Sequence, residues 1–232
     1  MKEHTDLCIL ISAGAEWRGL LPHFPGVEIH QSPYGEFFIE TVANREVCFM
    51  HGGSGKVAAA GSTQYAIDRW NPRGIINIGT CGGFQGRVDQ GDVILAKKTI
   101  IYDIYEQMSD PDQAIKAYST LLDLSWLPEP PPQPVRVEIL LSADRDINPE
   151  EIPFLIEKYD ARAADWESGA IAWIAQRNKL PCLILRGVSD LVGAGIASAY
   201  GDYGYFEAQS KTIMANFAHH LPGWIDTFQK RL

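Results

Sequence analysis

The stretch LPCLILRGVSDLVG, residues 180–193, places an arginine and an aspartate at the end of an apolar run. Cys182–Leu185 is typical of a buried strand, and Arg186 and Asp190 follow it. Burying a charge is costly unless that charge is paired or used. We therefore expect Arg186 and Asp190 to have partners, or a chemical role, where this strand ends.

Two more carboxylates flank a tryptophan in ARAADWESGAIAWIAQ, where Asp165 and Glu167 stand on either side of Trp166. The residues that follow, Ala170–Ala175, are almost wholly apolar and predict a buried helix. A carboxylate at the mouth of such a helix suits the binding of vicinal hydroxyls, because its two oxygens accept two hydrogen bonds. The alternative is that the acid only caps the helix or complements its dipole.

The loop HGGSGKVAAAG follows a predicted strand and opens a predicted helix. Its residues Gly53, Gly55 and Ala58 fit the G-x-G-x-x-A dinucleotide fingerprint. The acid that should follow about 20 residues later is missing, and Val57 replaces the Ser or Thr of a P-loop. The loop is either a tight strand-to-helix turn or a backbone cradle beside a small ligand.

A cysteine lies within INIGTCGGFQG, where Gly79-x-Cys81-x-Gly83 has the spacing of a nucleophile elbow. A cysteine nucleophile needs a base, and His51 is the histidine near a predicted strand end. Three interpretations stay open: a Cys81-dependent hydrolase, a small residue in a close-packed turn, or a turn that brings backbone N–H groups and the Thr80 hydroxyl to a ligand.

Short apolar runs that alternate with longer amphipathic stretches must position these residues. The predicted strands are Leu7–Ser12, Val47–Met50, Gly74–Ile78, Val93–Ala96, Val135–Leu141 and Leu180–Val188. The predicted helices are Lys56–Trp70, Pro149–Tyr159, Glu167–Asn178 and about Tyr205–Arg231. A hairpin is expected to turn at Ala43–Asn44–Arg45. The alternation predicts an α/β protein whose mainly parallel sheet is covered on both faces.

Ligands of such sheets bind at the carboxyl ends of the strands. Two of the segments expected there, His51–Lys56 and Gly79–Phe84, are rich in glycine. Four others contain a carboxylate, and they are Ala13–Glu16, Ser142–Asn148, Asp165–Ser168 and Val188–Leu191. Glycine-rich backbone and acids are therefore expected to meet at one edge of the sheet.

Composition narrows the class of protein. The 232 residues carry a formal net charge of −9, which argues against a nucleic-acid or anionic-membrane surface. We expect one domain, residues 1–232, with neither a signal peptide nor a membrane span. The four cysteines lack C-x-x-C spacing and suit a reducing cytoplasm. The adjacent His219 and His220 lack helical ligand spacing, so no metal site is expected.

Taken together, SAGAE, SGKVAAA, NIGTCGGF, GDVILA, LSADRDI, WESGAIA and LRGVSDL resemble the nucleoside phosphorylase and nucleosidase superfamily in order and spacing. The most similar branch is that of the 5′-methylthioadenosine/S-adenosylhomocysteine nucleosidases. The resemblance covers about Leu7 to Leu221. It implies a three-layer α/β/α sandwich around a central mixed, mainly parallel twisted sheet, and no metal or organic cofactor.

The resemblance also implies roles for individual residues. Asp190 is similar to the general acid that protonates the purine, and Ser189 to the residue that orients this acid. Arg186 is similar to the arginine behind the acid; pairing there would lower the pKa of Asp190, whereas partial burial would raise it. Glu16 is similar to the glutamate that activates water.

Further residues match the family's substrate contacts. Glu167 is similar to the glutamate that binds the ribose hydroxyls, and Trp166 replaces the usual Met under the sugar. The other candidates in the loops around the base and the water are Ser54, Thr80, Gly82, Asp146 and Ile147.

This chain departs from the family at two positions. The phosphorylase branch has a phosphate-binding arginine where this chain has Asn77. Phosphate needs cations, and the Lys56 noted in the candidate loops is shared with the nucleosidase branch, which favours water over phosphate. Asp146 stands where bacterial nucleosidases have a base-packing Phe. It would either hydrogen-bond a base edge or face solvent, and it leaves the adenine assignment open.

Two aromatic segments complete the expected site. IIYDIYEQM resembles the segment with which a second subunit closes the 5′ end of the pocket, with Tyr105 and Met108 as candidates. Tyr200, Tyr203, Tyr205 and Phe206 are expected to form a mobile lid before the last helix, or only a partly exposed helix start.

The sequence thus predicts a cytoplasmic, homodimeric N-ribosyl hydrolase that removes a purine from a 5′-modified nucleoside. Adenine is the purine that we expect. The partner of the enzyme is a small-molecule nucleoside, without nucleic acid or membrane. The alternatives are a phosphorolytic nucleoside phosphorylase, the Cys81-dependent hydrolase, and a binding protein that senses a nucleoside without catalysis. The presence of Glu16, Glu167 and Asp190 together argues against the last alternative.

Overall fold

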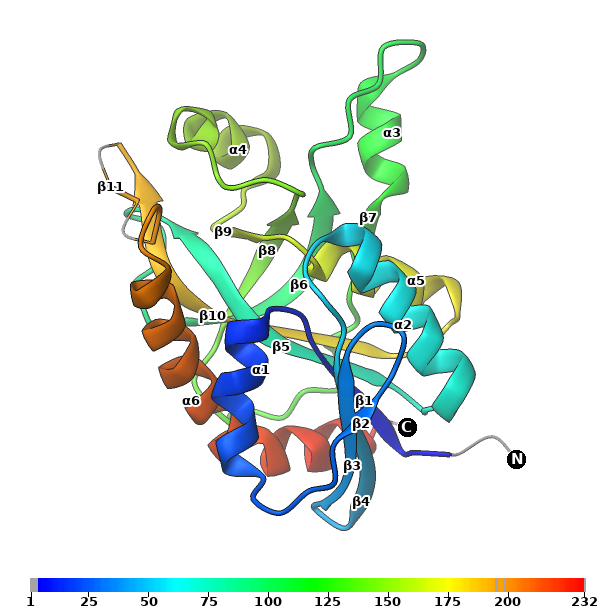
Figure 1. The fold of residues 1–232 in the computed structure, drawn as a ribbon. Coiled ribbons are helices and arrows are strands. Elements are labelled where there is room, and N and C mark those ends of the chain that lie inside the picture. Colours follow the sequence, from blue (N-terminus) through cyan, green and yellow to red (C-terminus); the bar gives the residue numbers. More distant parts are fainter. Residues whose placement is uncertain (1–3, 195, 198, 232) are drawn as a thin grey trace.

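A mixed sheet of eleven strands organises the computed structural model, which describes residues 4–194, 196–197 and 199–231 (Figure 1). The strands are β1 (Leu7–Ile11), β2 (His30–Gln31), β3 (Glu36–Val42), β4 (Arg45–His51), β5 (Ile75–Phe84), β6 (Val93–Ile101), β7 (Ser119–Leu121), β8 (Arg136–Ser142), β9 (Ala163–Asp165), β10 (Cys182–Gly193) and β11 (Ile196–Ala197). The pairs β4–β1, β1–β5, β5–β10, β6–β8 and β8–β9 are parallel. Antiparallel pairs such as β10–β6 and β5–β9 make the sheet mixed.

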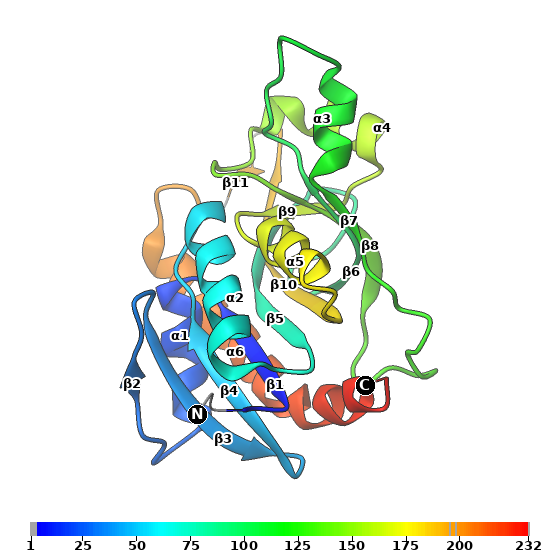
Figure 2. The same ribbon diagram turned by 90° about the vertical axis from the view of Figure 1, so that its right-hand side faces the viewer.

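Helices cover the sheet on both sides, as the sequence predicts. They are α1 (Gly14–Leu20), α2 (Lys56–Trp70), α3 (Pro111–Ala117), α4 (Ile152–Tyr159), α5 (Ser168–Arg177) and α6 (Tyr203–Gln229), with short 3₁₀ turns at Leu21–His23 and Pro149–Glu151. Figures 1 and 2 both show α2 beside α5 and α1 beside α6. One core cluster joins strands to α2 and α5, and another joins strands to α1 and α6. The predicted three-layer α/β/α fold is confirmed.

Strands β5 and β10 run further than the sequence analysis expected. We predicted that they end at Ile78 and Val188, but they stay paired as far as Phe84 and Val192. The glycines of GTCGGF allow this, because they leave room for the side chains that pack on the faces of the sheet at these positions. A Cβ at Gly83, for example, would lie 2.6 Å from Val88 and 2.7 Å from Val188. Thr80 and Asp190 are therefore held inside strands.

Several local predictions are confirmed. The β3–β4 hairpin turns at Ala43 and Asn44, whose φ angles of 51° and 58° give the left-handed geometry of a tight two-residue turn. Helix α6 begins at Tyr203, two residues before the predicted start, and contains Pro222, which removes one hydrogen-bond donor from the helix. Within the described segments, no helix combines the length and the apolarity needed to cross a bilayer.

Candidate active site

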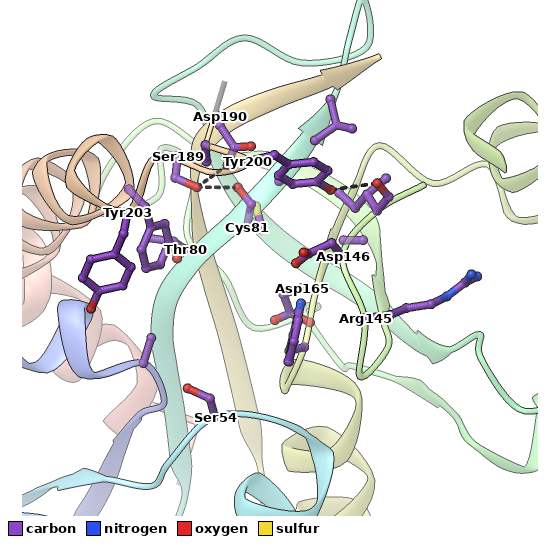
Figure 3. Close-up of a pocket in the computed structure, with 18 of the residues that line it drawn as sticks. Ser54, Thr80, Cys81, Arg145, Asp146, Asp165, Ser189, Asp190, Tyr200 and Tyr203 are labelled. Atoms are coloured by element: carbon purple, nitrogen blue, oxygen red, sulfur yellow. Dashed lines mark hydrogen bonds between the residues drawn. The ribbon is translucent and has the colours of Figure 1, made fainter. Parts of the chain in front are cut away.

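A cavity of about 640 Å³ opens at the carboxyl ends of β5, β8 and β9 and along the last residues of β10 (Figure 3). The beginning of α6 closes one side of it. The predicted site residues that line it are Glu16, Ser54, Thr80, Gly82, Asp146, Ile147, Trp166, Glu167, Ser189, Asp190 and Tyr200. The expectation that acids and glycine-rich backbone meet at one sheet edge is confirmed.

Arg186 lies beneath the cavity floor and is fully buried. Its guanidinium forms ion pairs with Asp165 at 2.9 Å, and with Glu16 and Glu167 at 3.6 Å each. It also donates hydrogen bonds to Asn77 Oδ1 at 2.8 Å and Ser168 Oγ at 2.9 Å. The buried cation that the sequence left without a partner is therefore the common partner of three carboxylates from α1, β9 and the start of α5.

The pairing of Arg186 with Asp190 implied by the resemblance is wrong, since none of the ion pairs and hydrogen bonds of the described residues joins them. The register of β10 shifts between Val188 and Asp190. Val188 and Leu191, three residues apart, consequently pack against the same core cluster. This irregularity moves Asp190 off the face that carries Arg186.

Asp190 is 5% exposed, and Ser189 Oγ lies 2.7 Å from its Oδ1. Burial raises the pKa of Asp190, the hydrogen bond from Ser189 opposes this rise, and the nearby charge of Asp146 adds to it. The question that the sequence left open is thereby decided in favour of burial, because Arg186 is engaged elsewhere. The environment of Asp190 therefore raises the pKa of its carboxyl group above the ordinary value of an aspartate.

Glu16 is held by hydrogen bonds at both carboxylate oxygens. Its Oε1 accepts from the Thr80 backbone N–H at 2.6 Å and from Thr80 Oγ1 at 2.8 Å, and its Oε2 accepts from the Ala13 N–H at 3.0 Å. A Cβ on Gly79 would lie 2.3 Å from Arg186 and 2.7 Å from Glu16, so glycine is required there. Glu16 is 2% exposed yet lines the cavity, an arrangement that suits a base of fixed orientation.

Glu167 shares this buried environment. Burial raises its pKa to about 8; the Arg186 charge opposes the rise, while the charges of Asp165 and Glu16 add to it. One guanidinium cannot neutralise three carboxylates, and this shortage of positive charge is why the pKa of Glu167 stays raised although Arg186 is nearby. The Glu167 Oε1 accepts the Gly55 N–H at 3.0 Å, which orients the carboxyl group toward the cavity.

The loop Gly53–Lys56 is not a phosphate cradle. The Gly55 N–H donates to Glu167, and the Lys56 N–H donates to Asp144 Oδ1 at 2.7 Å. The Lys56 ammonium forms ion pairs with Asp103 and Asp144. Carboxylates thus occupy the donors that a nucleotide phosphate would need, and the structure favours the tight strand-to-helix turn over a backbone cradle for a ligand.

Cys81 lines the cavity, but its surroundings do not activate it. Burial raises the pKa of the Cys81 thiol well above its usual value, and the charge of Asp165 adds to this effect. The predicted base His51 stacks on Trp17 instead, with 5.9 Å between the ring centroids. The thiol therefore stays protonated, which removes the basis for a Cys81-dependent hydrolase.

Three predicted site residues do not line the cavity, namely Arg186, which lies beneath its floor, and Tyr105 and Met108. Tyr105 and Met108 are 82% and 95% exposed on the segment before α3. Their predicted role in the pocket of a second subunit stays a prediction. Trp166 is 38% exposed at the cavity, and the Tyr200 hydroxyl donates to the Ile147 carbonyl at 2.7 Å.

The sequence analysis missed Arg145, which lines the cavity beside Asp146. It named Cys81 and Asp165, which also line the cavity, but did not include them among the expected substrate contacts. The signal for Asp165 was available, because an acid at the end of a short apolar strand needs a buried cation, and Arg186 needed a partner.

Comparisons with known proteins agree with this geometry. A sequence profile of the Phosphorylase superfamily matches residues 6–221. A Tolumonas auensis 5′-methylthioadenosine/S-adenosylhomocysteine nucleosidase is 28% identical over 191 residues, 77% of this chain and 83% of that protein. The Neisseria meningitidis nucleosidase solved with methylthio-immucillin-A has a TM-score of 0.75 at 21% identity, covering 97% of this chain and 99% of that one. A Helicobacter pylori futalosine hydrolase mutant has a TM-score of 0.78 at 19% identity, covering 95% and 98%.

The raised pKa of Glu167 predicts a pH-dependent loss of stability. Because the folded-state pKa lies above the ordinary 4.5, the stabilisation is complete below about pH 4.5 and is lost as the pH rises through about 8. We expect Glu167→Gln to reduce the fall in unfolding free energy between pH 5 and pH 9, by on the order of a few kcal/mol at most. Urea unfolding at both pH values measures this. Glu28→Gln, at an exposed carboxylate, is the control; an equal fall in wild type and Glu167→Gln would contradict the assignment.

Proposed function

Because the chain belongs to the phosphorylase superfamily, we propose that it is a nucleosidase, which hydrolyses the N-glycosidic bond of a 5′-modified purine nucleoside of the 5′-methylthioadenosine or S-adenosylhomocysteine type. The observation that carries the proposal is the convergence of Asp190, Glu16 and Glu167 on one cavity. The pKa of Asp190 is raised by burial, and Glu16 is fixed by its hydrogen bonds. We place the reaction in a single domain, residues 1–232.

In this reaction the Asp190 carboxyl donates its proton to N7 of the purine while the C1′–N9 bond breaks. The electron pair of that bond goes to the base, which leaves as a neutral purine, and the sugar passes through an oxocarbenium-like state. Glu16 accepts a proton from the attacking water, whose oxygen bonds to C1′. Asp190 ends ionised and Glu16 ends protonated, and one proton exchanged through solvent restores both groups.

Other cavity residues bind and orient the nucleoside. Glu167 holds the ribose hydroxyls, and Trp166 packs under the sugar. Ser189 orients Asp190, which it contacts directly. The remaining contacts come from Thr80 and Gly82 near the water, from Ser54 in the adjacent loop, and from Ile147 and Tyr200 at the base.

The nucleophile is water rather than phosphate. A phosphate arrives as an anion and needs cations and free donors. Here Asn77 accepts a hydrogen bond from Arg186, and the donors of Gly55 and Lys56 are committed to carboxylates. Glu16 would repel a phosphate, whereas water needs a base of this kind.

We also propose that the enzyme is a cytoplasmic homodimer. The Lys56–Asp103 ion pair holds the segment before α3 beside the start of α2. Val57, Tyr105 and Met108 stand on these two segments with 85%, 82% and 95% of their surface exposed. A second copy would cover these apolar side chains. All four cysteines are buried and none of them forms a disulfide bond, which suits a reducing compartment.

Asp190→Asn should keep the fold and lose base release. The amide preserves shape but supplies no proton, so kcat should fall by about 10²–10⁴. Purine release from 5′-methylthioadenosine measures the rate, and thermal unfolding checks the fold. Asp89→Asn, at an exposed acid outside the cavity, should retain full activity. Near-normal turnover by folded Asp190→Asn would refute the role of Asp190.

Hydrolysis predicts free sugar as the product, at a rate that does not depend on phosphate. Glu16→Gln should be inactive, because the amide accepts no proton from water. Assays with and without phosphate, in which both free sugar and sugar 1-phosphate are quantified, test this. A sugar 1-phosphate that forms at a phosphate-dependent rate would make the protein a phosphorylase instead.

Val57→Asp should weaken the dimer without harming α2, because an acid in the first turn of a helix is favourable. We expect a shift toward monomer in sedimentation velocity, together with a raised KM. Asp68→Asn, further along α2, provides a control that changes charge by one unit at a distance from this surface. A wild-type protein that sediments as a monomer would contradict the homodimer.

A further inference from the structure

Asp146 is a solvent-exposed carboxylate at the wall of the active-site cavity. It follows β8 in the loop that also carries Ile147, and it lines the cavity. Across the described residues, no group donates a hydrogen bond to its carboxylate or pairs with it. Its acidic neighbour Asp144, by contrast, is engaged by the backbone and the ammonium of Lys56.

The adjacent cation does not neutralise Asp146. Arg145 donates to Glu151 at 2.9 Å, and its guanidinium lies 5.2 Å from the centre of the Tyr102 ring. Both contacts direct the Arg145 charge away from Asp146. The carboxylate is therefore available to a ligand, and it attracts one that offers a donor or a positive charge.

Asp146 and Asp190 act on the same part of the cavity. The charge of each raises the pKa of the Tyr200 hydroxyl, after the larger effect of burial. Tyr200 is anchored to the loop by its hydrogen bond to the Ile147 carbonyl. Figure 3 shows Asp146, Tyr200 and Asp190 around this end of the cavity. Because Asp190 must reach the base, this end is the one that receives the purine.

We infer that Asp146 determines base specificity, by accepting a hydrogen bond from the exocyclic amino group of a 6-aminopurine and by excluding 6-oxopurines. The inference rests on the proposed nucleosidase function. In a purine, N7 and the substituent on C6 share one edge, so a base that offers N7 to Asp190 brings that substituent to the same end of the cavity. An amino group donates to Asp146, whereas an oxo group has only lone pairs to present to it.

The same placement favours the transition state over the bound substrate. The base gains positive charge as it accepts the proton from Asp190, and the fixed negative charge of Asp146 stabilises this charge. Asp146 thus binds an amino-substituted base by a hydrogen bond and stabilises the positive charge that this base gains in the transition state.

The test compares 5′-methylthioadenosine with 5′-methylthioinosine, which differ in the C6 substituent. Wild type should prefer the amino compound in kcat/KM. Asp146→Asn should reduce this preference by about ten- to a hundredfold, because the amide keeps the shape but can donate to the oxo oxygen. Glu150→Gln removes one charge from an exposed residue of the same connection outside the cavity and should leave the preference unchanged.

Two readouts separate this role from a structural one. The groups facing Asp190 are Asp146, Ser189, Tyr200 and Cys81. Of these groups, Asp146→Asn removes only the charge of Asp146, which raises the pKa of Asp190. Without that charge the pKa of Asp190 should fall, and the alkaline limb of the kcat/KM profile should move to lower pH. If the variant turns over too slowly to measure, tryptophan fluorescence can give the dissociation constants of adenine and hypoxanthine. Their ratio then measures the preference for the amino base over the oxo base.

The outcomes distinguish the two proposals. A wild type that releases base from neither substrate overturns the proposed function, and the role of Asp146 with it. A wild type that hydrolyses 5′-methylthioadenosine, with the same amino-to-oxo ratio in folded Asp146→Asn, overturns the inference and leaves the nucleosidase standing. A reduced ratio with an unchanged Glu150→Gln control supports the inference.

Discussion

The rest of the active site depends on one buried guanidinium. Arg186 connects α1 through Glu16, β9 through Asp165 and the start of α5 through Glu167. None of these acids could stay inside the protein without it, because a buried charge needs a partner. Gly79 in β5 leaves room for the Arg186 side chain, with which any Cβ at this position would clash. The positions of Glu16 and Glu167, for which we propose the roles of base and ribose-binding group, thus depend on one cation.

The site separates its acids into two electrostatic environments. Around Arg186, the carboxylates share one positive charge and a network of donors that includes Thr80. Asp190 lies beyond the register shift of β10, without a cation of its own and with Asp146 nearby. Carboxyl groups in one cavity can therefore hold different protonation states, and a reaction that needs both a proton donor and a proton acceptor requires such a difference.

Much of the fold and of the candidate site was predictable from the sequence, because apolar runs and the acids that follow them are local signals. The three-layer fold, Glu16, Glu167 and the glycine-rich edge all follow from such patterns. The separation of Asp190 from Arg186 was not readable, since one extra residue in β10 reverses the side-chain alternation and no composition signal marks it. Nor was the continuation of β5 through its glycines, which depends on the neighbouring strand rather than on local propensity.

The start of α2 carries three consecutive residues with three different attachments. Gly55 holds the carboxyl group of Glu167, Lys56 holds Asp103 on the segment before α3, and Val57 stands exposed at the surface. These residues belong to a single turn, so a displacement of one displaces the others. A partner bound over Val57 would therefore rest on the same turn whose backbone N–H orients Glu167 in the cavity.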